Sequence, residues 1–188
     1  MSNLANTLAK RIGERQDRSP FLVAIDGRCA SGKTTLANEL QALLPCAVIH
    51  MDDFFLRPSQ RTEERLRTAG ENVDHERFLE EVLVPLRRGA TPSYRPFSCK
   101  TLSLGEPILL PSASIYLIEG SYACHPTLRP YYDLTVFLTT SEDEQMRRIK
   151  KRNGDMEAVA FQERWIPMEE AYFSAFHIAE QCDCRFEN

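Results

Sequence analysis

Short apolar runs alternate with segments of helical periodicity along the first fifty residues. Residues 21–25 and 46–50 are too short for helices and rich in branched side chains, which predicts two buried strands. Between them, apolar residues recur at helical spacing over residues 33–44, and Pro45 ends the pattern. Apolar side chains at four-residue steps over residues 4–16 predict an amphipathic helix ahead of the first strand.

The middle of the chain predicts one helix followed by an irregular insertion. Residues 75–88 place apolar side chains on one helical face, with Asp74 as the start signal and Gly89 as the stop signal. Residues 90–113 contain four prolines, which indicates an irregular loop or a hairpin insertion.

Two more apolar runs and a short terminal one complete a predicted sheet. Residues 115–118 and 134–138 have the length and composition of buried strands, and residues 184–186 suit a last short strand. Strands that alternate with helices in this way predict a mostly parallel sheet with helices on both faces.

The segment between the last two strands is predicted to be helical. Ser141 and Glu144 have the spacing of a capping box, in which each residue satisfies a backbone amide of the other, and a helix runs from there to about Arg152. A longer helical stretch covers residues 154–181, with an interruption near Pro167.

Composition agrees with one ordinary α/β domain over residues 1–188. A net charge of -4 argues against a protein that grips nucleic acid by its phosphates. The N-terminus has no apolar core of signal-peptide length, and no run of 18 apolar residues follows, so we expect a cytoplasmic protein without membrane contact. Six scattered cysteines are expected to be free thiols, and the spacing of Cys182 and Cys184 does not suit a zinc site.

The loop after the first strand carries a phosphate-binding pattern. It matches G-x-x-x-x-G-K-[ST] with Gly27, Arg28, Cys29, Ala30, Ser31, Gly32, Lys33 and Thr34. Its glycines let consecutive amides point at phosphate oxygens, and the following helix adds its positive end. Lys33 is expected to reach the β- and γ-phosphates of ATP, while the Thr34 hydroxyl ligates Mg²⁺.

Acidic residues follow two other strands at the same predicted edge. Asp52 and Asp53 come directly after the second strand, where one carboxylate is well placed to take a proton from an attacking hydroxyl. The alternative is that both only cap the next turn. Glu119 closes the third strand and is expected to position Mg²⁺ or its bound water, unless it is merely a surface acid before a turn.

Together these motifs resemble the uridine kinase and phosphoribulokinase family of P-loop kinases, which is also similar to the nicotinamide riboside and pantothenate kinases. The most specific parts are residues 32–35, which add Thr35 to the ATP-binding loop, and residues 51–55, 72–75 and 118–120. The resemblance implies a P-loop NTPase fold, a three-layer sandwich around a sheet of about five strands. It also implies a small lid near residues 145–160 and an acceptor-site insertion near residues 55–113.

The resemblance also assigns site residues. Asp52 would be the catalytic base, and Glu119 would join Thr34 around magnesium. Phe55 and Tyr94 would lie at the acceptor, and Asp74 would hold the ribose hydroxyls. Asp74 is equally well explained as a helix N-cap, and both readings stay open.

A basic run with members Arg147, Arg148, Lys150, Lys151 and Arg152 would belong to the lid in this family. Arg148 would stabilise charge on the transferring phosphoryl group and Arg152 would bind ATP, by the resemblance alone. The alternative is that these cations complement the dipole of the helix they end.

One departure from the uridine kinases bears on the substrate. Those enzymes place a base-reading histidine where this chain has Cys99, and a thiol is a weak donor. We expect an ATP- and Mg²⁺-dependent kinase that phosphorylates a hydroxyl of a nucleoside-like or other ribosyl metabolite. The alternatives are a pantothenate or sugar kinase of the same fold and, in another class, a nucleotide-gated regulatory protein. The partner is a small molecule, and a homo-oligomer stays open.

Overall fold

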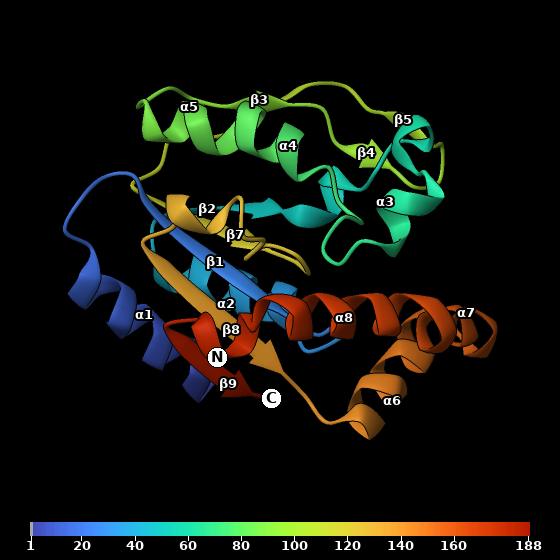
Figure 1. The fold of residues 1–188 in the computed structure, drawn as a ribbon. Coiled ribbons are helices and arrows are strands. Elements are labelled where there is room, and N and C mark those ends of the chain that lie inside the picture. The colour runs from blue at the N-terminus through green and yellow to red at the C-terminus, as the bar shows by residue number, and fades with distance from the viewer. Residues whose placement is uncertain (1) are drawn as a thin grey trace.

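A five-stranded sheet forms the centre of the protein in a computed structural model that describes residues 2–188. Its strands are β1 (Phe21–Gly27), β2 (Cys46–His50), β7 (Ile115–Glu119), β8 (Leu134–Thr139) and β9 (Cys184–Glu187). They lie in the order β2-β7-β1-β8-β9, and every pairing is parallel. The predicted parallel sheet is confirmed, and β9 shows that the short terminal run is its edge strand (Figure 1).

Helices cover both faces of the sheet and make three layers. One face packs against α1 (Asn3–Arg15) and α2 (Lys33–Leu43), with Leu8, Ile12 and Leu40 wholly buried there. The other face packs against the helical segment that begins at His75 and against α8 (Ile166–Phe176) and α9 (Ile178–Gln181). The sheet is therefore buried on both sides, which explains its continuous apolar runs.

The helix predicted for residues 75–88 is present, with a π turn in its middle. It consists of α4 (His75–Phe78), the π-helical η3 (Leu79–Leu83) and α5 (Val84–Arg87). Asp74 caps it by accepting a hydrogen bond from the Arg77 amide at 3.3 Å. Pro85 is the second residue after the π turn, where a wider helix relieves the clash of the proline ring with the preceding turn.

The proline-rich insertion folds as two small antiparallel pairs. β3 (Ser93–Tyr94) pairs with β6 (Ile108–Leu109), and β4 (Phe97–Ser98) pairs with β5 (Ser103–Leu104). The hairpin expectation is confirmed. Together with α3 (Glu63–Arg67), these strands form the upper part of the molecule in Figure 1. Short 3₁₀ turns complete the connections: η1 (Met51–Phe54), η2 (Pro58–Gln60) and η4 (Arg129–Tyr131).

The predicted capping box at Ser141 is only half formed. Its hydroxyl accepts a hydrogen bond from the Glu144 amide at 3.4 Å and begins α6 (Glu142–Asn153). The second predicted contact, from the Glu144 side chain back to the Ser141 amide, does not form, because the Glu144 carboxylate binds Arg147 and Arg148 instead. Two guanidinium groups offer charge-assisted hydrogen bonds that a single backbone amide does not match.

The helical stretch after Gly154 does not break where the sequence suggests. It comprises α7 (Asp155–Ala160), the π-helical η5 (Phe161–Trp165), α8 and α9. The interruption predicted near Pro167 is wrong, because the wide turn η5 accommodates the proline and the chain stays helical there. The break lies at His177, which adopts a left-handed conformation with φ 49°.

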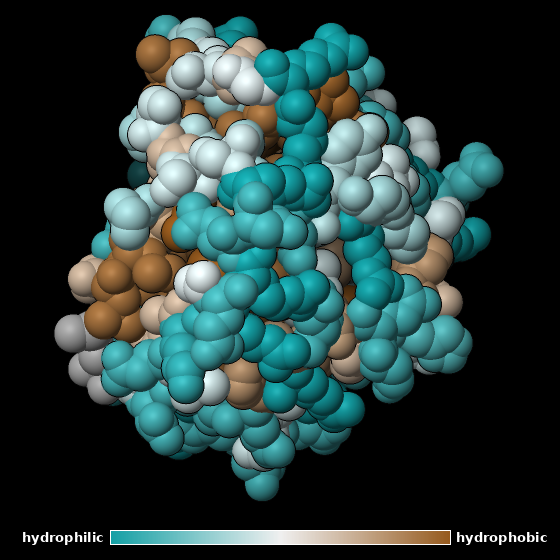
Figure 2. All heavy atoms as spheres, turned by 90° about the vertical axis from the view of Figure 1, so that its left-hand side faces the viewer, coloured by the Kyte–Doolittle hydropathy of each residue, from teal (hydrophilic) through white to brown (hydrophobic). Residues whose placement is uncertain are grey.

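The outer surface is mainly polar on the side that Figure 2 presents. This is the left-hand side of Figure 1, and hydrophilic residues cover most of it, with apolar ones confined to small patches. Among residues 2–188, no helix has the length and apolar character needed to cross a membrane.

Candidate active site

A cavity of about 760 Å³ opens at the carboxyl edge of the parallel sheet. Its walls come from the loop after β1, the turn after β2, the segment after β7, the insertion, and helices α6 to α8. Ligands of open α/β sheets bind outside the carboxyl ends of the strands. Elements that contribute lining residues lie apart in the chain: the insertion is at the top of Figure 1, and α6 and α8 are at its lower right.

The loop after β1 has a backbone that only glycine allows at two positions. Gly27 has φ 138° and Gly32 has φ 100°, and a Cβ at Gly27 would overlap the Leu138 carbonyl of the neighbouring strand. Lys33, only 7% exposed, donates to the carbonyls of Gly27 at 2.7 Å and Arg28 at 2.8 Å. The loop is thus folded around its own lysine.

Most of the predicted nucleotide-binding residues share the cavity wall. The wall includes Cys29, Ala30, Gly32, Lys33, Thr34, Thr35 and Arg152. Gly27, Arg28 and Ser31 lie outside it. Arg28 faces away and pairs with Glu170 at 2.7 Å, while Ser31 is wholly buried.

The two predicted magnesium ligands lie together. The Thr34 hydroxyl is 3.1 and 3.2 Å from the two carboxylate oxygens of Glu119. Adjacent ligands of an octahedral ion with metal–oxygen distances of about 2.1 Å are roughly 3 Å apart, so this pair fits one edge of a Mg²⁺ coordination sphere. Hydroxyl and carboxylate oxygens are also the donor type that Mg²⁺ prefers.

His50 is a partner of Glu119 that sequence reasoning missed. Strands β2 and β7 pair in a register that sets His50 opposite Glu119, and the His50 Nδ1 lies 2.5 Å from the Glu119 Oε1. This hydrogen bond to the carboxylate raises the pKa of His50 above its ordinary value. The alignment of two strand ends explains the contact, and no local sequence pattern indicates it.

Asp52 and Asp53 have different surroundings. Both lie in the 3₁₀ turn η1, so they do not alternate across a strand. Asp52 lines the cavity, where partial burial of its carboxylate, with Glu119 nearby, raises its pKa. Asp53 instead accepts a hydrogen bond from the Tyr94 hydroxyl at 2.8 Å. Only Asp52 faces the cavity.

The other predicted acceptor residues divide in the same way. Phe55 lines the cavity, whereas Tyr94 and Asp74 do not. Asp74 is 2% exposed, caps α4, and holds its Oδ2 3.5 Å from both the Arg57 and Arg77 guanidinium groups. That Oδ2 accepts no hydrogen bond among the described residues. Asp74 therefore acts as the N-cap of α4, and its Oδ2 can still accept a further hydrogen bond.

Two of the arginines expected in a lid approach the loop from α6. Arg148 donates to the Ala30 and Ser31 carbonyls at 3.2 and 3.3 Å, and Glu144 holds it at 2.7 Å. Arg152 lies further along the helix, with its guanidinium over the Phe161 ring. Both line the cavity. The first is anchored by an acid, and the second has no carboxylate partner among residues 2–188.

A buried acid on α8 also supports the loop. Glu169 is 6% exposed and accepts hydrogen bonds from the Cys29 amide at 3.0 Å and from the Ser121 hydroxyl at 2.6 Å. Ser121 in turn lies 3.4 Å from the Lys33 Nζ. Burial of the Cys29 thiol, together with the negative charge of Glu169 beside it, raises the pKa of that thiol to about 12, so Cys29 stays protonated.

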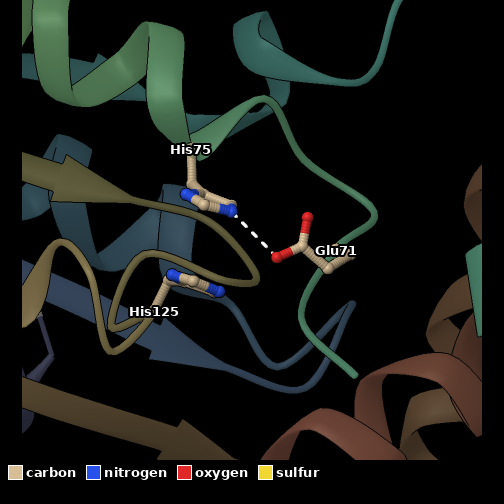
Figure 3. Close-up of side chains that lie close together, drawn as sticks. All are labelled: Glu71, His75 and His125. Atoms are coloured by element: carbon tan, nitrogen blue, oxygen red, sulfur yellow. Dashed lines mark hydrogen bonds and ion pairs between the residues drawn. The ribbon is translucent and has the colours of Figure 1, made fainter. Parts of the chain in front are cut away.

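Glu71, His75 and His125 form a cluster beside this site (Figure 3). The two imidazoles stack with centroids 4.0 Å apart, and the His75 Nε2 lies 3.0 Å from Glu71. The Thr127 amide donates to the His125 Nδ1, which leaves the proton of the neutral ring on the Nε2 that faces Glu71. Metal ligation needs the opposite tautomer, so the arrangement suits hydrogen bonding better than an ion.

Comparison with known proteins identifies the family. No family model matches the chain. A uridine kinase from Ureaplasma urealyticum is 30% identical over 163 residues, which cover 78% of each chain. The chain belongs to the uridine kinase family. A uridine kinase from Staphylococcus haemolyticus is 32% identical over 156 residues and 73% of each chain. A solved structure described as a possible uridine kinase from Bacillus stearothermophilus has the same fold, with a TM-score of 0.74 and 22% identity over 97% of this chain and 96% of that one.

Membership in the uridine kinase family makes this chain a P-loop kinase, and the resemblance stated from its motifs is confirmed. Sequence reasoning missed several cavity residues of this kinase. Glu169 carried one signal, because it shares a helical face with the buried Tyr172 and Phe173, where an acid is unusual. Ser121 and Arg61 carried none beyond their place near a motif.

Proposed function

We propose that the chain transfers the γ-phosphoryl group of ATP, with Mg²⁺, to a hydroxyl of a small ribosyl metabolite. One observation carries this proposal. The phosphate-binding loop, the Thr34–Glu119 pair and the Asp52 carboxylate share a single cavity. A regulatory protein that only senses nucleotide has no need for a carboxylate facing an acceptor space.

Each of these groups has a distinct role in the proposal. Lys33 leaves the loop carbonyls and binds the β- and γ-phosphates, and the amides of the loop bind the remaining oxygens. Thr34 and Glu119 would hold Mg²⁺, which would supply charge neutralisation at the phosphate oxygens. Asp52 accepts the proton of the attacking hydroxyl, for which a raised pKa is an advantage because it makes the carboxylate a better base.

The lid arginines complete the donor side. Arg148 bridges α6 and the loop carbonyls, so its charge is placed before nucleotide arrives. Arg152 has no acid to release and is free to bind phosphate oxygens. Motion of α6 and α7 toward the insertion would close the cavity over both substrates.

The ribosyl part of the proposal rests on the family and on Asp74. The free Oδ2 of Asp74 could accept a hydrogen bond from a ribose hydroxyl once the segment that holds Arg57 opens. Phe55 and Leu66 provide apolar wall for a flat or aliphatic group. A ribosyl metabolite offers both features.

The proposal is tested by measuring ADP formation with a panel of ribosyl and other hydroxyl-bearing metabolites, followed by mass spectrometry of the product. We expect at least one to raise ADP formation many-fold, with a mass gain of one phosphoryl group. Lys33→Ala should abolish this response. Stimulation by a protein partner alone, with no phosphorylated metabolite, would favour the regulatory alternative.

A further inference from the structure

Arg61 is a cation on the acceptor side of the cavity that has no acidic partner. It follows η2, a few residues after the Asp52–Phe55 motif. Its Nε donates to the Leu56 carbonyl at 2.9 Å, and its guanidinium lies 5.7 Å from the centre of the Phe97 ring. These two contacts fix the side chain and leave the outer edge with both terminal nitrogens unpaired among the described residues.

Arg164 is a second such cation on the lid side of the same cavity. It lies in η5, with its guanidinium 4.6 Å from the centre of the Trp165 ring, and no carboxylate of residues 2–188 pairs with it. Besides Arg152, which is assigned to ATP, the cavity therefore has one unpaired arginine on the insertion wall and one on the lid wall.

None of the carboxylates that line the cavity forms an ion pair with Arg61 or Arg164. Glu119 is bound by Thr34 and His50, and Glu169 is bound by the Cys29 amide and Ser121. The remaining acid is Asp52, which is not within ion-pair distance of either arginine. An acid from a ligand is the partner that both arginines lack.

Neutral recognition groups are scarce at this end of the cavity. Its neutral polar wall contains Asn72, the neighbouring Tyr122 hydroxyl and the Cys99 thiol, and Phe55, Leu66 and Trp165 add apolar surface. A neutral base edge needs several directed donors and acceptors, and here Asn72 and Tyr122 lie against each other while the thiol is a weak donor. A planar guanidinium with a free edge instead matches a carboxylate or phosphate in bidentate geometry.

We propose that the acceptor alcohol of this kinase carries an anionic group, a carboxylate or a phosphate, which binds Arg61 and is enclosed by Arg164 when the lid closes. This inference rests on the proposed kinase function. It separates the chain from a kinase for neutral nucleosides, because the energy of acceptor binding comes from a charge-assisted pair and not from base readout.

Three matched pairs of alcohols test the charge directly: orotidine with uridine, pantothenate with pantothenol, and ribose 5-phosphate with ribose. Binding of each is measured by calorimetry on the full chain with Mg²⁺ and a non-hydrolysable ATP analogue. In at least one pair the anionic member should bind about tenfold to a hundredfold tighter, the usual strength of a hydrogen bond to a charged group. The first two pairs identify a carboxylate and the third a phosphate.

Arg61→Gln should abolish this preference while the affinity for the ATP analogue stays within a few-fold. Arg67→Gln is the matched control, since Arg67 pairs with Glu63 on α3 and does not line the cavity. Equal or tighter binding of the neutral member in all three pairs overturns the inference, as does an anion preference that survives in Arg61→Gln. A comparable loss of nucleotide affinity in Arg61→Gln would assign Arg61 to the donor and also overturn it. Failure of the kinase function is a separate result, namely the absence of any phosphorylated product while the binding data still decide the acceptor charge.

Discussion

The Thr34 hydroxyl lies 3.1 Å from the Glu119 carboxylate and ties the start of α2 to the end of β7. The strand register sets His50 against the same carboxylate, at 2.5 Å. Glu119 therefore has three contacts to offer: it holds Thr34 at the start of α2, it holds His50 at the end of β2, and its negative charge is placed to bind a cation. The raised pKa of His50 follows from this shared charge.

Glu119→Gln should weaken the binding of magnesium to the kinase. The amide removes the charge that attracts the ion but keeps the shape, so the Mg²⁺ concentration for half-maximal activity should rise about tenfold to a hundredfold. A magnesium titration of ADP formation at fixed ATP measures this.

His50→Gln is the comparison variant, because it keeps a hydrogen-bond donor beside Glu119 and leaves the proposed metal ligand itself in place. Its magnesium requirement should rise less than that of Glu119→Gln. If Glu119→Gln titrates like the wild type, Glu119 has no part in metal binding.

Glu169 should act on nucleotide binding through the loop. Its carboxylate holds the Cys29 amide and reaches Lys33 through Ser121. Glu169→Ala leaves that buried amide without a partner, at a cost of about 1–3 kcal/mol, and should raise the KM for ATP by about tenfold or more. Glu169→Gln retains an acceptor and should recover most of the loss.

Glu170→Gln tests whether any acid of α8 would have the same effect. Glu170 pairs with Arg28 on the outside of the loop and should leave the KM for ATP within a few-fold of wild type. A defect of Glu169→Ala that appears only in thermal stability and not in the KM would leave Glu169 a structural residue.

The central sheet could be predicted from sequence because strands buried on both faces carry continuous apolar runs that need no tertiary context. The phosphate loop was equally accessible, since its spacing is local. The interruption expected near Pro167 was wrong because the π turn η5 depends on packing around that proline, which periodicity does not register. The hydrogen bonds of Glu169 to Cys29 and Ser121 join segments far apart in the chain, so the local pattern shows an unusual buried acid on α8 but not its partners.

His125 should make the protein less stable in mild acid. Burial, the facing charge of His75 and the more distant Arg65 lower its pKa from 6.5 to about 4, and Glu76 opposes them only partly. The unfolded chain therefore binds a proton between pH 6.5 and 4 that the folded chain does not. Stability from this group is complete above pH 6.5 and falls by about 3 kcal/mol as the pH drops to 4.

Denaturant unfolding of wild type and His125→Asn at pH 7 and pH 5 measures this contribution. Asparagine keeps an acceptor for the Thr127 amide but does not titrate. The difference in unfolding free energy between the two proteins should shrink as the pH falls. Parallel stability curves for the two proteins would mean that His125 does not titrate in this range.

Asp52 should act at the chemical step and not in nucleotide binding. Asp52→Asn keeps the size of the side chain and some hydrogen bonding but removes the basic carboxylate. General-base catalysis typically contributes about 10² to 10⁴ in rate, so kcat should fall by that order while the Kd for ATP stays within a few-fold. Turnover with the acceptor identified in the metabolite panel, together with equilibrium nucleotide binding, measures both quantities.

Asp53→Asn is a control that the structure sharpens. Asp53 accepts a hydrogen bond from Tyr94 and lies outside the cavity wall, so its amide variant should lose some stability but retain turnover. Tyr94→Phe removes the other half of the same hydrogen bond and should match Asp53→Asn in both respects. If Asp53→Asn is the inactive variant and Asp52→Asn turns over normally, the two acids exchange roles in the closed enzyme. If both variants remain active, neither carboxylate is the base, and the proton of the acceptor hydroxyl must pass to another group of the cavity.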